Sequence, residues 1–289
     1  MKIVATLSAA FALLAVPAAL SAHVVWTLPN QADPSIVGLY HFEQAGAPST
    51  GGALVNVFGA SSPGELLIQS PVGTGFSFSS STAGLPLGVK SLRADGVQRA
   101  DSLGLFDSAH DTTIETWLKW DPAPAASGIE FGFRSSAKLR LIRDPLSPAA
   151  DRFGLAGTHG SFVSANGFTD WTTIGTEEAP YDEWVHVAVV VHPTGLQYNS
   201  TADHDEYTAG SVARFYLNGH LFGAPTDVSG LLVHGESKLT ISVLNGAVQL
   251  DEVTIWNRDL SNNGAVTSPF ANGRGSGVTA ADSQWQAYE

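Results

Sequence analysis

The sequence predicts an all-β protein in which two antiparallel sheets pack face to face as a sandwich. Thirty Gly and fifteen Pro residues interrupt the 289-residue chain at short intervals, and only 14% of the residues are charged. Long amphipathic helices with paired Glu and Lys residues are absent. About a dozen short apolar runs, two of them joined to the next by Asn-Gly, are typical of a two-sheet sandwich or jelly roll.

The first residues are typical of an export signal. An apolar run over residues 3–20 follows Lys2, and small residues end it near Ala22, where a signal peptidase could cut. Pro17, the high alanine content and the lack of a second group of positive charges favour removal over retention as a membrane anchor. We therefore expect a signal peptide over 1–22 and a bacterial mature chain that is secreted, periplasmic or on the cell surface, with no stable membrane span.

The mature chain would keep 267 residues, enough for one large domain with its own core. The absence of cysteine excludes disulfides and thiol chemistry. A net charge of −13 argues against nucleic acid or an anionic membrane surface as a general partner. We expect an N-terminal extension over 23–35, a single jelly-roll domain over 36–262 and a Gly-rich tail over 263–289.

Strict alternation of apolar residues predicts the clearest strands, over 112–120 and 184–192. In the second strand four valines at alternate positions line one face, which we assign to the core. Its other face is also largely apolar, as expected for a central strand that is covered on both sides. In the first strand Trp117 lies on the face away from the core. A further strand is expected over 36–42.

Turn signals connect other strands. An Asp-Gly pair at 95–96 separates two short strands, and residues 129–142 are typical of a hairpin. Asn-Gly pairs at 218–219 and 245–246 predict two more hairpins, because both residues tolerate positive φ. After the second pair the apolar phase slips by one residue, which predicts a β-bulge at 251–252.

Four segments in a fixed order are similar to those of a known family. They are W-V-H-V-A from Trp184, Y-L-N-G from Tyr216, D-E-V from Asp251 and N-R-D-L-S from Asn257. With similar opening segments they extend over residues 36–261. The chain thus resembles the laminin-G-like jelly-roll group of the concanavalin A-like lectin/glucanase superfamily. This resemblance implies a jelly-roll sandwich, but it implies less about activity, because the fold carries lectins, adhesins, hydrolases and lyases.

The resemblance to glucanases calls for a test of catalysis. Those enzymes are similar to one another in an E-x-D-x-(x)-E strand, whose two carboxylates must lie about 5 Å apart on one sheet face. The nearest match here, Gln249–Thr254, begins with Gln, and its adjacent Asp251 and Glu252 would point to opposite faces. We therefore predict a structural role for Asp251 at the bulge and no catalytic pair.

Calcium is the metal that the sequence favours. The resemblance implies Ca²⁺ in rim loops, and Asp203, Asp205 and Glu206 gather in the segment 201–207. A solvated acidic hairpin tip is the simpler explanation of the same residues. None of the nine histidines has the spacing of a known metal motif, and a copper site begun by His23 would need a second histidine in a different topology.

A glycan site needs exposed aromatic rings beside polar groups. The candidates for ligand contact are Trp117, Trp171, Tyr181 and Arg140, the last as part of a small basic strip suited to an acidic polysaccharide.

The leading hypothesis is an extracytoplasmic, non-catalytic binding module for a glycan or surface polymer, with calcium as a helper. The first alternative is a structural or adhesion protein of the envelope that binds other proteins. The second is a polysaccharide hydrolase or lyase with an unrecognised site. The sequence identifies no ligand.

Overall fold

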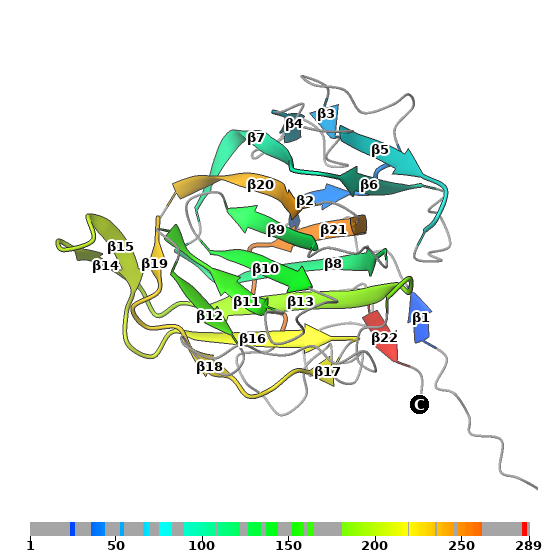
Figure 1. Cartoon of the computed structure of the whole chain (residues 1–289). Helices are drawn as coiled ribbons and strands as arrows, with labels where there is room; N and C mark the ends of the chain where they lie inside the picture. Colours follow the sequence, from blue (N-terminus) through cyan, green and yellow to red (C-terminus); the bar gives the residue numbers. More distant parts are fainter. Residues whose placement is uncertain are drawn as a thin grey trace, which may run out of the picture.

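The structure is a computed structural model of the chain, and its regular elements are β-strands that pair antiparallel throughout the described ranges (Figure 1). It describes residues 24–26, 36–43, 53–54, 66–69, 75–82, 90–107, 109–121, 127–133, 137–143, 152–158, 161–164, 181–218, 220–234, 236–245, 248–261 and 285–287. The all-β, two-sheet antiparallel prediction is therefore confirmed.

One large sheet has eight strands in the order β12-β11-β10-β9-β20-β7-β4-β3, and it forms the front layer of Figure 1. Its strands are β3 (Ala53–Leu54), β4 (Leu66–Ile68), β7 (Gln98–Asp107), β9 (Ser127–Phe133), β10 (Lys138–Arg143), β11 (Arg152–Ala156), β12 (Phe162–Ser164) and β20 (Glu236–Asn245).

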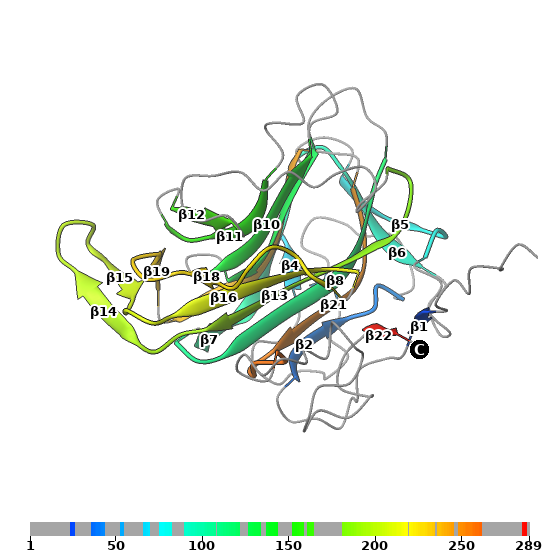
Figure 2. The ribbon, with the colours of Figure 1, turned by 90° about the horizontal axis from the view of Figure 1, so that it is seen from below.

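The second large sheet has nine strands. Its main path is β17-β16-β13-β8-β21-β6-β5, with β18 paired to β16 and β2 paired to β21. Its strands are β2 (Ile36–Tyr40), β5 (Gly75–Ser79), β6 (Ser91–Asp95), β8 (Thr112–Trp120), β13 (Val185–His192), β16 (Val212–Leu217), β17 (His220–Leu221), β18 (Thr226–Asp227) and β21 (Val248–Trp256). In Figure 2 the strands β8, β13, β16 and β21 of this sheet lie below β10, β11 and β12 of the first, so the two sheets form the layers of the sandwich.

Two small sheets complete the fold. The strands β14 (Leu196–Asn199), β15 (His204–Tyr207) and β19 (Leu232–Val233) form an arm that projects from one side of the sandwich (Figure 2). The strands β1 (Val24–Trp26) and β22 (Trp285–Ala287) pair with each other. The sequence had predicted no strand in the Gly-rich tail, and this pairing joins it to the N-terminal extension.

The main hydrophobic core lies between the two large sheets. The four alternating valines of β13 belong to it, as predicted, and so do Phe131 and Ile241 from the opposite sheet. The outer face of the nine-stranded sheet carries a second buried cluster, which includes Val190 and Trp256. Both faces of β13 are therefore covered, which confirms the prediction made for a central strand.

Of the predicted hairpins, two are confirmed and one is wrong. β9 pairs with β10, and β16 pairs with β17 through Asn218, whose φ is 49°. By contrast β20 and β21 do not pair: β20 lies between β7 and β9, and β21 lies in the other sheet. Val243 and Val248 both enter the main core, so the chain crosses between the two layers here. The Asp-Gly pair at 95–96 likewise separates strands of different sheets, β6 and β7.

The predicted β-bulge is confirmed. The register of β21 against β8 shifts between Asp251 and Thr254, and Glu252 has a φ of 51°. The extra residue changes which face the following residues take. Val253 and Ile255 thereby join the main core after the bulge, as Val248 and Leu250 do before it.

Candidate binding cleft

Three neighbouring strands of the nine-stranded sheet, β13, β8 and β21, have ends that lie side by side at one end of the sheet. β8 is antiparallel to both β13 and β21, with Thr112 opposite Val191 and Thr113 opposite Trp256. The residues just before β8 therefore lie beside those just after the other two strands. The fold thus brings three polar connecting segments together that are far apart in the sequence.

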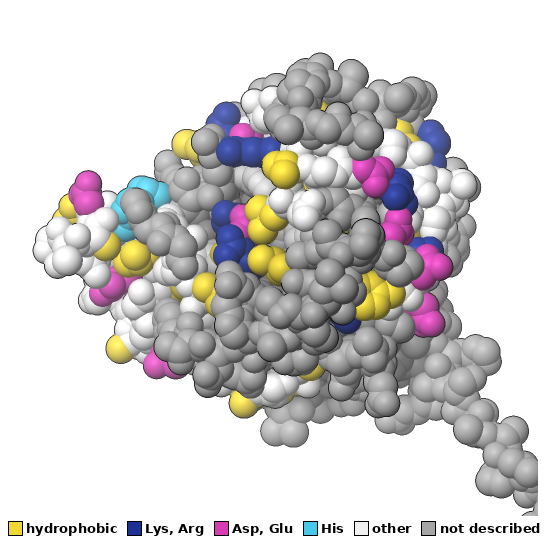
Figure 3. Space-filling view, viewed as in Figure 1, with side chains coloured by type: hydrophobic (Ala, Val, Ile, Leu, Met, Phe, Trp, Pro, Cys, Tyr) yellow, Lys and Arg dark blue, Asp and Glu magenta, His cyan; other side chains and the backbone are white. Residues whose placement is uncertain are grey.

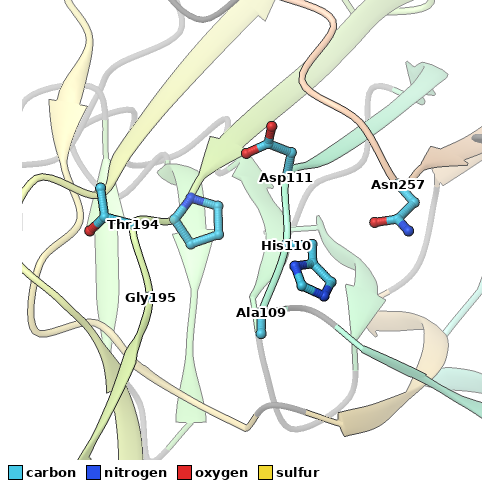
Figure 4. A pocket seen from close by; sticks show the side chains of 7 residues that line it. Ala109, His110, Asp111, Thr194, Gly195 and Asn257 are labelled. Carbon is cyan, nitrogen blue, oxygen red and sulfur yellow. The ribbon is translucent and has the colours of Figure 1, made fainter.

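These segments line an open cleft of about 660 Å³. Figure 4 shows Thr194 and Asn257 on opposite sides, with His110 and Asp111 between them. The lining residues are Ala109, His110, Asp111, Pro193, Thr194, Gly195 and Asn257. A carboxylate, an amide, an imidazole and a hydroxyl group therefore come together in one cleft with small residues between them.

An ion-pair network lies behind the cleft. The Nδ1 atom of His192 is 2.7 Å from Oδ1 of Asp111, and both side chains are about one third exposed, at 34% and 35%. Asp259 is buried, with its Oδ2 atom 4.0 Å from Nδ1 of His192 and 3.9 Å from Nη1 of Arg214. The network thus joins two carboxylates, one imidazole and one guanidinium at this end of the sheet.

Hydrogen bonds fix the Thr194 side of the cleft. The Thr194 hydroxyl donates to the main-chain oxygen of Ala209 at 2.9 Å and lies 2.9 Å from the Thr208 hydroxyl. The Thr194 amide donates to Oγ of Ser211 at 3.0 Å. Asp259 is held in the same way, because its Oδ1 accepts from the amide and the hydroxyl of Ser261. The Thr194 hydroxyl in the cleft and the Asp259 carboxylate behind it are thus oriented before any ligand arrives.

Two of the three aromatic candidates are described, and neither presents an open ring. Trp117 is 1% exposed and packs against His186 with ring centroids 5.0 Å apart, on the covered outer face of the nine-stranded sheet. Tyr181 is half-buried, and the guanidinium of Arg143 lies 4.6 Å from its ring centroid. Trp171 lies outside the described residues. Trp117 would have to be uncovered before it could stack on a ligand.

The outer face that contains Trp117 also holds a buried polar cluster. Nε2 of His186 lies 3.1 Å from Oε2 of Glu115, and the Trp256 indole donates to Oε1 of Glu115 at 2.9 Å. All three residues are fully buried. At the bulge the Thr116 hydroxyl donates to the main-chain oxygen of Asp251 at 2.9 Å, which is a structural contact. These groups hold strands together inside the protein.

The acidic residues proposed for calcium lie on the projecting arm. Asp205 and Glu206 are adjacent in β15 and so point to opposite faces. The Tyr198 hydroxyl donates to Asp203 at 2.5 Å, which raises the pKa of Tyr198. Within the described ranges no three His, Cys, Asp or Glu side chains are grouped as metal ligands. The three residues thus do not converge, and calcium binding stays a prediction.

Arg140, the fourth ligand candidate, lies on the outer face of the eight-stranded sheet, away from the cleft. It pairs with Glu130, which also accepts from Nζ of Lys138 at 2.8 Å. The cleft and Arg140 are therefore separate features of the two sheets.

The sequence did not predict the cleft residues. His110, Asp111, Thr194 and Asn257 lie within two residues of the ends of β8, β13 and β21, and that position was the only signal available. Polar residues at strand ends are common, so the pairing of β8 with both β13 and β21 was needed to bring them together.

Fold and cleft together define a jelly-roll sandwich with a polar cleft at the end of one sheet. The family described as the concanavalin A-like lectin/glucanases superfamily matches residues 93–264, more than half of the chain. The chain belongs to this superfamily. No curated protein matches it.

Several solved structures are similar in fold. The receptor-binding domain of a botulinum neurotoxin of mosaic serotype C/D is 12% identical over 78% of this chain and 48% of its own, with a TM-score of 0.45. The chain thus spans about half the length of that domain. Domain 4 of an extracellular arabinanase from Geobacillus stearothermophilus, in complex with arabinotriose, is 12% identical over 78% of this chain and 93% of its own, with a TM-score of 0.43. A carbohydrate binding module from Bacillus subtilis is 15% identical over 63% and 96%, with a TM-score of 0.35.

No helix in the described ranges is long and apolar enough to cross a membrane.

Proposed function

We propose that this chain is an extracytoplasmic binding module that takes a neutral glycan in the cleft. The observation that carries the proposal is the meeting of Asp111, Thr194 and Asn257 in one open cleft. Sugar hydroxyls both donate and accept hydrogen bonds, so a carboxylate acceptor beside an amide suits them. The volume of about 660 Å³ lies in the range of small-ligand sites.

Membership of a superfamily that includes lectins supports binding as the role. The fixed hydrogen bonds of Thr194 support it as well, because a site with oriented groups loses less entropy when it binds. The apolar segment near the start of the chain supports export. Calcium on the arm remains part of the proposal only as a helper, and chelation tests it.

The test measures the binding of a panel of neutral oligosaccharides, with and without EDTA. The proteins are the purified mature chain and two single-residue variants of it. Asp111→Asn keeps the side-chain shape and removes the charge, so we expect binding at least tenfold weaker. Asp182→Asn is the matched control, because Asp182 precedes β13 as Asp111 precedes β8 in the same sheet, and it is paired with Lys119 at 2.7 Å. Binding that is equal in both variants, or no binding by the wild type, would overturn the proposal.

Two results would replace it by an alternative. Release of reducing ends that stops in Asp111→Asn would make the cleft a hydrolase site. The projecting arm favours the adhesion alternative, because Tyr198 is 63% exposed at its end. That alternative would be established by a purified envelope protein that binds this chain. Added sugars should not compete with this binding, and Tyr198→Ala should abolish it.

A further inference from the structure

The outer face of the eight-stranded sheet carries charged residues in register across four neighbouring strands. One cross-strand row runs Arg140, Glu130, Ser242 and Arg99 over β10, β9, β20 and β7. At about 4.8 Å per strand the two arginines lie about 14 Å apart along this row. Figure 3 views the molecule from this side and shows groups of Lys and Arg side chains with hydrophobic side chains beside them.

The carboxylates on this face lie beneath the cations. Glu130 is 5% exposed and binds both Arg140 and Lys138, which are 20% and 15% exposed. Asp101 is 6% exposed and holds Arg99, 33% exposed, by two bonds of 2.8 Å. An approaching ligand therefore meets the cationic groups first, and the carboxylates fix their directions.

The arginines retain donors for a ligand. A guanidinium has five N–H donors, and in both residues the bonds to the carboxylate involve Nε and Nη2. This leaves Nη1 of Arg99 and of Arg140 for a further acceptor. Because Glu130 pairs with both Arg140 and Lys138, these three side chains together carry one net positive charge. Ser242 lies in the row between Glu130 and Arg99, and its small side chain leaves the surface between the two arginines flat.

An aliphatic row lies directly beside the charged one. Ile142 and Leu244 flank Gly128, where an added Cβ would lie 3.0 Å from Ile142 Cγ1 and 3.5 Å from Leu244 Cβ. Leu244 is 36% exposed. An anionic ligand for this face should therefore carry both acidic groups and C–H surface.

We propose that this face binds a linear polyuronate, an acidic polysaccharide with one carboxylate on each sugar. The carboxylates would pair with Arg99 and Arg140, and the C–H faces of the rings would lie on Ile142 and Leu244. Guanidinium groups suit carboxylates in particular. The net charge of −13 opposes polymers of higher charge density such as nucleic acid. This inference rests on the proposed glycan-binding function and adds a second site with its own ligand.

The test is titration calorimetry of the mature chain with a polyuronate oligosaccharide and with its methyl-esterified form. The wild type should bind the acid form at least tenfold more tightly, and the difference should shrink as salt is added. The double variant R99Q/R140Q should lose at least tenfold in affinity. Arg93→Gln is the matched control: Arg93 is 32% exposed and pairs with Asp95 and Asp121, but it lies on the other large sheet.

A second pair of variants leaves every arginine in place, in case the double variant does not fold. Ser242→Glu puts a carboxylate directly opposite Arg99, and Ser77→Glu does the same opposite Arg93. Only the first should weaken polyuronate binding.

Three outcomes would overturn the inference while the proposed function stands. The first is equal affinity for the acid and the esterified oligosaccharide, and the second is an equal loss of polyuronate affinity in a variant and its matched control. The third is a loss of polyuronate binding in Asp111→Asn alone. Binding of neutral glycans without any binding of polyuronate would also overturn it alone. If no polysaccharide of either kind binds, the proposed function fails with it.

Discussion

The outer faces of the two large sheets both bury carboxylates but use them differently. On the nine-stranded sheet Glu115 accepts one hydrogen bond from Trp256 and contacts His186, and all three side chains are fully buried. On the eight-stranded sheet the buried Glu130 and Asp101 hold cations whose ends reach solvent. A carboxylate with aromatic partners thus helps to close a face, whereas one with flexible cationic partners orients charge towards a ligand.

The largest effect that tests this comparison is expected at Trp117. Trp117→Ala should lower the free energy of unfolding by about 3–5 kcal/mol, because a large buried ring is lost from the closed face. Chemical denaturation measures this. The control Tyr198→Ala, at a residue 63% exposed, should change it by less than about 0.5 kcal/mol. A small loss of stability together with loss of glycan binding would instead return Trp117 to the role that the sequence suggested.

A second prediction compares the two faces of one strand. Val189 lies in the main core and Val190 in the outer cluster, and both are fully buried. Because both are packed, Val189→Ala and Val190→Ala should each cost about 1.5–3 kcal/mol of unfolding free energy. Val97→Ala, at a residue 51% exposed, is the control and should be near neutral. If Val190→Ala behaved like the control, the outer face of β13 would not be a closed layer in solution.

The sequence predicted well what depends on local pattern. Strand alternation placed the valines of β13 in the core, and the phase slip located the bulge at 251–252. Both signals are local, because the side-chain period of two decides which residues share a face. The same alternation placed Trp117 away from the core, but it could not show that this face is buried as well.

The wrong hairpin prediction and the missed cleft both depend on which strands are neighbours. The Asn-Gly pair at 245–246 suits a hairpin, yet β20 and β21 on either side of it lie in different sheets. The turn residues set the local backbone but not the partner, which long-range core packing decides. The same holds for the cleft: Asp111, Thr194 and Asn257 are ordinary residues at strand ends until the strand order makes them neighbours.

The smallest effect is expected at Glu206, a partly exposed residue on the projecting arm. Its hydrogen-bond donors are two uncharged amide side chains. Hydrogen bonds from Asn199 at 2.8 Å and Gln197 at 2.7 Å lower the pKa of Glu206 from its ordinary value of 4.5. A lowered pKa in the folded state means that these bonds stabilise the hairpin above pH 4.5. That contribution is lost as the pH falls through the folded-state pKa.

Gln197→Ala removes one donor and leaves Asn199 in place, so it should move the pKa of Glu206 part of the way back towards 4.5. Carboxyl NMR titration of both proteins measures the shift. Asp227 is the internal control, because its pKa is lowered by Ser229, which the substitution does not touch. An unchanged Glu206 titration would mean that these hydrogen bonds are not kept in water. Only buried carboxylates such as Glu115 and Glu130 would then organise a surface of this protein.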